Sequence, residues 1–280
     1  MSRKRRPVDR GEIHDHNGEA TLYLALFVSP ELQDQIHALQ AERDELAERL
    51  ARAEHIHGLL LNSRSWRLTR PLRDVAAARR TRIFVKNLRL LHDTLADTEL
   101  AGHYWVWSGL LIGWAREGKP LAHDSLDADF CVLAGDMPRF GSAVPALIEA
   151  GFVPWQRFVT NDGTAVIYTF RRDGIVLEFF GMEPVDGRLR YYEFNTSRPT
   201  QAAASIADQE RVPFEFIGRT WLKHADHDAE LTAIYGPWRI PDPDWWYMNS
   251  RTIVDRTVWT RADELDWGGD FGSLDTQGVI

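Results

Sequence analysis

The sequence contains a single cysteine, Cys131, and no apolar run long enough to cross a bilayer. One cysteine has no partner for an internal disulfide, so a reducing compartment is the expected setting and buried packing the expected role of Cys131. The longest apolar stretch near the start, LYLALFV, is far shorter than the roughly 20 residues of a membrane-spanning helix. The basic start MSRKRR is followed by polar residues, a poor pattern for a signal peptide. We therefore expect a cytoplasmic protein.

An excess of positive charge is also lacking. The 41 acidic residues outnumber the 33 basic ones and give a formal net charge of −8. Such a balance repels a polyanion, so nucleic acid is not an expected partner. The hydrophobic fraction of 44% is that of an ordinary globular protein. With 280 residues, the chain can form one catalytic domain with accessory segments.

The segment YWVWSGLLIGWAREGKPLAHDSLDADF, residues 104–130, concentrates the residues that suggest chemistry. An apolar run ends at Ser108-Gly109, a helix-like LLIGWA follows, and three aspartates precede the apolar run FCVLAG. Backbone N–H groups at a Ser-Gly turn before a helix present a site for an anion, although such a turn is usually only a helix cap. The order strand, Ser-Gly, helix and acidic strand is the ground plan of a nucleotidyltransferase-fold core, and it predicts a metal–nucleotide site.

The three aspartates are Asp124, Asp127 and Asp129. Asp127 and Asp129 are two residues apart, so on a strand both carboxylates point to one face. Close carboxylates repel each other unless a cation lies between them, and Mg²⁺ prefers such oxygen ligands. Glu178 interrupts the otherwise apolar strand IVLEFF, where an uncompensated charge is costly. We predict that Asp127, Asp129 and Glu178 bind the metal. The alternatives are a solvated acidic loop and a glutamate at an exposed strand end.

GLLIGWAREG resembles the signature of the LicD/fukutin-related phosphotransferase family, in which a G-T-L-L-G-x-x-R-x-G helix leads into an acidic D-D-D-I-D strand. HDSLDADF carries the acidic part in altered form, and VLEFFGM resembles the later strand whose acid completes the family's metal site. YGPWRIP, residues 235–241, resembles the Y-G-x-x-W-x-x-P that closes the family's domain. The resemblance spans residues 93–250.

The resemblance implies transfer of a phospho-alcohol group, such as phosphocholine or ribitol phosphate, from a CDP-linked donor to a glycan hydroxyl in surface-polysaccharide synthesis. Mg²⁺, or Mn²⁺, would neutralise the diphosphate and stabilise the leaving nucleotide. A nucleotide-linked donor and a glycan acceptor are thus the expected partners. Two alternatives remain open: a nucleotidyltransferase that moves NMP from an NTP to a small molecule or protein, and a non-catalytic scaffold in a glycan-assembly complex.

Several residues near the aspartates have expected roles in binding substrate. The N–H groups of the Ser-Gly turn would hold phosphate oxygens, and the arginine of the motif would add a bidentate clamp. Asp124 or Asp127 would take the proton from the attacking hydroxyl. His123, beside Asp124, is either a base or a hydrogen-bonding neighbour. The predicted substrate-binding residues are Ser108, Gly109, Arg116 and His123, and the predicted catalytic residues are Asp127, Asp129, Glu178 and Asp124.

Residues 29–62 are expected to form a coiled-coil helix that begins at Ser29-Pro30-Glu31. Its stripe of residues at spacings of three and four favours self-association, and the alternative is a single amphipathic helix packed on its own catalytic domain. The stripe consists of Ile36, Leu39, Arg43, Leu46, Leu50, Ala53, His57 and Leu60.

Residues 63–92 are expected to form a basic connector, in which Asp74 is the only acid. The connector is either a solvated helix face or a contact for anionic lipid or phosphate-rich glycan intermediates at the inner face of the membrane. SRSWRLTRPLR resembles connectors attached to bacterial enzymes of surface-polysaccharide synthesis.

The remaining sequence predicts an α/β (α+β) core over residues 93–262, between a flexible N-terminus (1–28) and a loose acidic tail (263–280). A helix is expected over 145–150, and strands over 152–159, 165–171 and 175–180 are separated by hairpin turns. Consecutive hairpins imply a mixed or antiparallel sheet. The tryptophans that close the domain favour core or lid packing over a sugar-stacking platform. They are Trp238, Trp245, Trp246 and Trp259.

Overall fold

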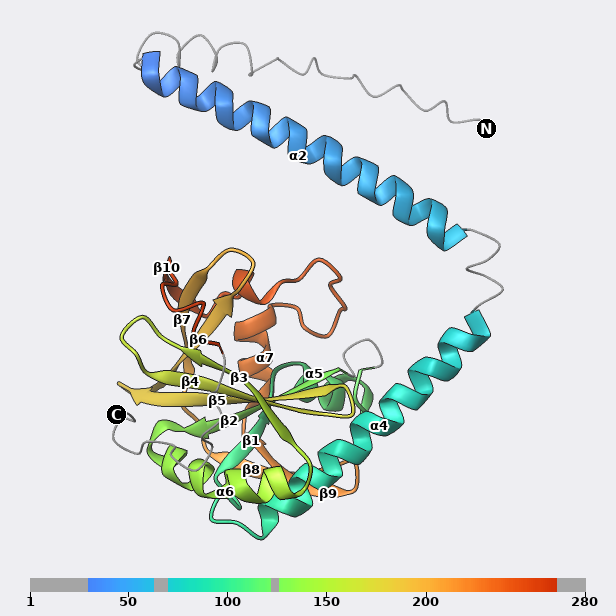
Figure 1. Ribbon diagram of the computed structural model, residues 1–280, viewed down its shortest axis with the longest axis vertical. Coiled ribbons are helices and arrows are strands. Elements are labelled where there is room, and N and C mark those ends of the chain that lie inside the picture. Colours follow the sequence, from blue (N-terminus) through green and yellow to red (C-terminus); the bar gives the residue numbers. More distant parts are fainter. Residues whose placement is uncertain (1–29, 63–69, 122–125, 266–280) are drawn as a thin grey trace, which may run out of the picture. The chain divides into compact units, whose positions relative to one another are not determined.

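The computed structural model describes residues 30–62, 70–121 and 126–265 (Figure 1). The chain divides into two compact units, residues 1–71 and 72–280. Three predictions lie outside the described residues. They concern the flexible N-terminus, His123 and Asp124, and the tail beyond residue 265. Among the described helices, none is both long enough and apolar enough to cross a membrane.

Helix α2 (Pro30–Asn62) begins at the proline that the sequence indicated. Pro30 suits the first turn because a helix makes no internal use of its first N–H groups. Leu39, Leu46 and Leu50 of the stripe are 64%, 50% and 60% exposed. Burial of an exposed leucine side chain would be favourable, so the predicted self-association of α2 through this face stays a prediction.

Helix α4 (Arg70–Ala96) crosses the domain boundary that the sequence suggested at residue 92. Its last half is buried at Phe84, Leu88, Leu91 and Leu95, each at most 1% exposed. These residues recur at helical spacing among the arginines and belong to the same core as the sheet. The predicted connector is therefore in part a helix of the second unit, whose core includes residues from 84 onward.

A mixed sheet forms the centre of the second unit, with the path β1-β2-β5-β6-β7-β10 and with β4 joining β3 to β5 (Figure 1). Its pairs are antiparallel throughout the described residues, apart from the parallel pair β2–β5. The expected mixed sheet is confirmed. The strands are β1 (Tyr104–Trp107), β2 (Asp127–Leu133), β3 (Val153–Val159), β4 (Ala165–Arg172), β5 (Ile175–Val185), β6 (Arg188–Asn195), β7 (Thr200–Ala207) and β10 (Ile253–Val258).

A separate hairpin and several helices complete the unit. The hairpin consists of β8 (Arg211–Phe216) and β9 (Arg219–His224). The helices are α5 (Ser108–Glu117), η1 (Ala134–Asp136), α6 (Met137–Glu149), α7 (His227–Tyr235) and η2 (Tyr247–Asn249). Helix α6 starts eight residues before the expected helix, because Pro145 lies inside it rather than at its beginning.

Alternation along the strands divides the buried side chains between two cores. Phe130 of β2 and Phe179 of β5 belong to one core, which also takes in α4, α5 and α6. Cys131, Phe180 and the neighbouring Trp107 belong to the other core, which includes residues of β6 and β7. Cys131 is fully buried, as expected from the sequence.

Gly113 shows why α5 needs a glycine in the middle of a helix. A Cβ placed there would lie 2.8 Å from the carbonyl oxygen of Lys119 and 3.1 Å from the nitrogen of Leu121. The chain returns across α5 at this point, and both close atoms belong to backbone, which cannot move aside cheaply.

We predict that Gly113→Ala lowers the free energy of unfolding by about 1–3 kcal/mol, because the added methyl group forces helix and returning chain apart. Denaturant unfolding followed by circular dichroism measures the change. Gly135→Ala is the matched control, since its Cβ would meet no atom within 4 Å. Equal stabilities of the two variants would contradict the close approach.

A second prediction concerns α2. If Leu39 and Leu46 form an intermolecular seam, Leu39→Glu combined with Leu46→Glu should convert an oligomer into a monomer, because burial of the new charges is unfavourable. Light scattering gives the molar mass. Ala38→Glu with Ala41→Glu adds the same charge on the other faces of the helix and should leave the oligomer intact. A wild-type monomer would rule out the seam.

Candidate metal and substrate cavity

A cavity of about 1290 Å³ opens on the sheet face that carries the second core. Its lining comes from the start of α5, from strands β2, β3, β5 and β6, and from the segment that follows α7. Pockets for one small molecule typically measure about 300–1,000 Å³. The cavity is therefore larger than a typical site for one small molecule.

The predicted metal ligands meet in this cavity. Asp127 and Asp129 alternate with buried Ala128, and in the parallel β2–β5 pair Asp129 stands directly opposite Glu178. All three carboxylates thus share one face of the sheet. Burial, and then the charge of Asp127, raises the pKa of Glu178 to about 7.

Ser108 and Gly109 line the same cavity from the first turn of α5. Ser108 has φ of 54°, a left-handed conformation that is unusual for a residue with a side chain. Its hydroxyl shares a 2.7 Å hydrogen bond with the Tyr235 hydroxyl, at the end of α7. The first turn of α5, whose N–H groups have no partner within the helix, thus lies at the cavity, and the Ser108 side chain is held by Tyr235.

Arg116 also lines the cavity, but its guanidinium already has a partner. It donates a short hydrogen bond to the carbonyl oxygen of Trp238, while Nε is buried without one. Arg116 therefore holds the segment after α7 in place and has donor capacity left for a ligand. Ser108 and Arg116 tie α5 to residues 235 and 238, which are 127 and 122 positions later in the chain.

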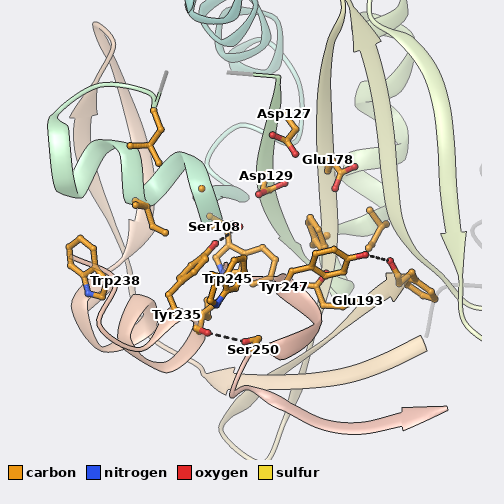
Figure 2. Close-up of a pocket in the computed structure, with 18 of the residues that line it drawn as sticks. Ser108, Asp127, Asp129, Glu178, Glu193, Tyr235, Trp238, Trp245, Tyr247 and Ser250 are labelled. Carbon is orange, nitrogen blue, oxygen red and sulfur yellow. Dashed lines mark hydrogen bonds between the residues drawn. The ribbon is translucent and has the colours of Figure 1, made fainter. Parts of the chain in front are cut away.

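The sequence reasoning missed a fourth carboxylate, Glu193 of β6. Burial, and then the charge of Glu178, raises its pKa to about 8. Figure 2 shows Asp127, Asp129 and Glu178 together and Glu193 farther along the cavity, beside Tyr247. The signal was available: Glu193 interrupts the aromatic run YYEF just as Glu178 interrupts IVLEFF.

Aromatic side chains supply much of the remaining wall. The Trp245 ring packs against Tyr235 with 4.3 Å between centroids, and the Tyr247 hydroxyl donates to the carbonyl oxygen of Phe194 at 2.9 Å. Of the closing tryptophans, Trp238 and Trp245 line the cavity, whereas Trp259 is buried in the second core. The wall thus combines flat apolar surfaces with carboxylates.

The donor set suits a hard divalent cation. Within residues 30–62, 70–121 and 126–265, no three acidic, histidine or cysteine side chains form a ready-made metal group. Mg²⁺, however, is usually held by one or two carboxylates, with water and substrate phosphates as further ligands. The repulsion between Asp127 and Glu178 is the kind that such an ion relieves.

Neither a scan of protein-family models nor a search of the curated proteins finds a match to this chain.

The raised pKa of Glu193 predicts a pH effect on stability. The folded chain keeps a proton that the unfolded chain, with the ordinary pKa of 4.5, has already released. Folding stability attributable to this group therefore falls as pH rises from about 4.5 to about 8. Glutamine does not ionise, so the stability of Glu193→Gln should not fall in this way as pH rises. The variant should be more stable than wild type at pH 8 by at least ~1 kcal/mol, with a smaller difference at pH 5.

Urea unfolding at both pH values, with a chelator present, measures this difference. The exposed Glu149→Gln on α6 is the control and should show no such change with pH. A Glu193→Gln variant whose advantage does not grow between pH 5 and pH 8 would show that the carboxyl is well solvated.

Proposed function

We propose that this protein is a metal-dependent phosphotransferase like those of the LicD/fukutin-related family, which transfers a phospho-alcohol group from a CDP-linked donor to a glycan hydroxyl. One observation carries the proposal. Asp127 and Asp129, Glu178 and the Ser108 turn come from separate elements and line one cavity, which is larger than a typical site for one small molecule. Residues from all parts of the resemblance contribute to that lining.

The carboxylates of Asp127, Asp129 and Glu178 would hold Mg²⁺ or Mn²⁺, which when bound neutralises diphosphate charge and stabilises the leaving nucleotide. The chain's own groups position the donor. The N–H groups of Ser108 and Gly109 bind phosphate oxygens, as N–H groups at helix starts do. Arg116 contributes its free donor capacity from the side of α5.

The acceptor hydroxyl must lose a proton as it attacks the phosphorus atom. Asp127, the more exposed of the β2 pair, lines the cavity and would accept this proton from a hydroxyl there. The aromatic surfaces around Trp245 stack on the flat faces of sugar or base rings and exclude water from the reacting groups.

The cellular setting follows from the same proposal. Donor nucleotides are made in the cytoplasm, so the enzyme would work there or at the inner face of the membrane. The exposed arginines Arg79, Arg80 and Arg82 of α4 offer a contact for anionic lipid or glycan phosphates. Self-association through α2 would bring several cavities to one surface and raise their effective concentration.

Two other functions fit the same carboxylates and are separated by simple assays. Release of labelled CMP from a CDP-alcohol supports the phosphotransferase, whereas transfer of label from CTP or ATP to a product indicates a nucleotidyltransferase. A purified protein that fails to bind Mg²⁺ or Mn²⁺ would favour a scaffold of a glycan-assembly complex.

We predict that Asp127→Asn or Asp129→Asn abolishes divalent-ion binding and transfer while the fold stays intact, because removal of one charge from a repelling group seldom destabilises. Calorimetry with Mn²⁺ and an assay of CMP release measure the two losses. Asp255→Asn, on exposed β10, is the matched control and should keep both activities. Near wild-type turnover in either cavity variant would show that the metal site lies elsewhere.

A further inference from the structure

The charges that line the cavity are strongly unbalanced. Among its described lining residues, five carboxylates face a single cationic side chain, Arg116, which is hydrogen-bonded to Trp238. A divalent ion at β2 and β5 accounts for part of this excess. The carboxylates are Asp127, Asp129, Glu178, Glu193 and Asp242.

Glu193 is the less exposed of the two carboxylates, Glu193 and Asp242, that the metal leaves unexplained. It extends from β6, which pairs with β7, whereas the metal-binding group lies on β2 and β5. In the described part of the chain it makes no hydrogen bond or ion pair, and the charge that helps to raise its pKa is that of another carboxylate, Glu178. Glu193 is partly buried, and ionisation of its carboxyl is unfavourable without a nearby cation, so this position favours a ligand that carries positive charge.

The surroundings of Glu193 favour an organic cation over a second metal ion. Tyr247 lies next to it, and the Tyr247 hydroxyl is engaged by the carbonyl oxygen of Phe194. Phe158 contributes further ring surface to the same cavity. Aromatic faces attract ammonium groups, whereas Mg²⁺ requires a shell of oxygen ligands.

We propose that the acceptor carries a protonated amine, as in an amino sugar or amino alcohol, and that Glu193 binds this ammonium group while Tyr247 and the neighbouring rings cover its carbon skeleton. This inference rests on the proposed function, because it assigns the Glu193 end of the cavity to the acceptor and the Ser108 end to the donor. The amine forms a charge-assisted hydrogen bond with the carboxylate, which fixes the acceptor beside the metal-binding group.

The test compares two probes of nearly the same ring, glucosamine and N-acetylglucosamine, of which only the first is charged. Binding to the full-length protein in saturating Mg²⁺ and at constant ionic strength is followed by tryptophan fluorescence and calorimetry. Wild type should bind glucosamine about tenfold more tightly, as expected for one charge-assisted contact. Glu193→Gln should lose this preference, keep its affinity for N-acetylglucosamine and keep Mg²⁺ binding.

Glu183→Gln is the matched control, because Glu183 lies on the β5–β6 hairpin and pairs with Arg190 outside the cavity. It should retain the preference for glucosamine. Wild type without a preference, or with no binding of either sugar, would overturn the inference. So would a Glu193→Gln variant that retains the preference, or one that loses Mg²⁺ binding as Asp127→Asn does.

The two proposals fail in different ways. If no Mg²⁺ binds but glucosamine is still preferred through Glu193, the phosphotransferase proposal fails and the amine site stands as a binding site. If Mg²⁺ binding and CMP release are present without any preference for the amine, only the amine site is wrong.

Discussion

The parallel pairing of β2 with β5 is the constraint on which the rest of this unit depends. It sets Asp129 opposite Glu178, and a shift of one residue would turn Glu178 to the other face. Parallel strands need a long connection, here residues 134–174, which supply α6, β3 and β4 and cover the first core. The β2–β5 pairing thus fixes both the positions of the clustered carboxylates and the connection that contains α6, β3 and β4.

The second organising feature is the link between helix α5 and residues 235–238. The hydrogen bonds of Ser108 with Tyr235 and of Arg116 with Trp238 join the first helix after β1 to the segment that follows the last helix. Gly113 allows the chain after α5 to pass close to the helix. Residues 108–116 and 235–238 are therefore in contact in space, which gives Ser108 and Arg116 a structural role in the fold.

Much of this arrangement was predictable because local patterns carry it. The start of α2 at Pro30, the strands near 152–180 and the shared face of Asp127 and Asp129 follow from spacing and turn residues. The role of α4 in the core was missed because four apolar residues are dispersed among arginines. Glu193 was missed although it interrupts the aromatic run YYEF, because that run does not show that Glu193 meets Glu178 in one cavity, which depends on long-range packing.

The hairpin between β5 and β6 is paired only from Glu183 to Val185 and from Arg188 to Arg190. Away from the hairpin, β5 pairs with β2 and β4, whereas β6 pairs with β7, so the two strands diverge. Glu178 and Glu193 lie on the diverging parts of β5 and β6, outside the paired residues. Backbone hydrogen bonds between β5 and β6 do not fix the distance between Glu178 and Glu193. A ligand that brought these parts of the strands closer would therefore break no such hydrogen bond. The width of the cavity is therefore set by side chains and by what binds between them.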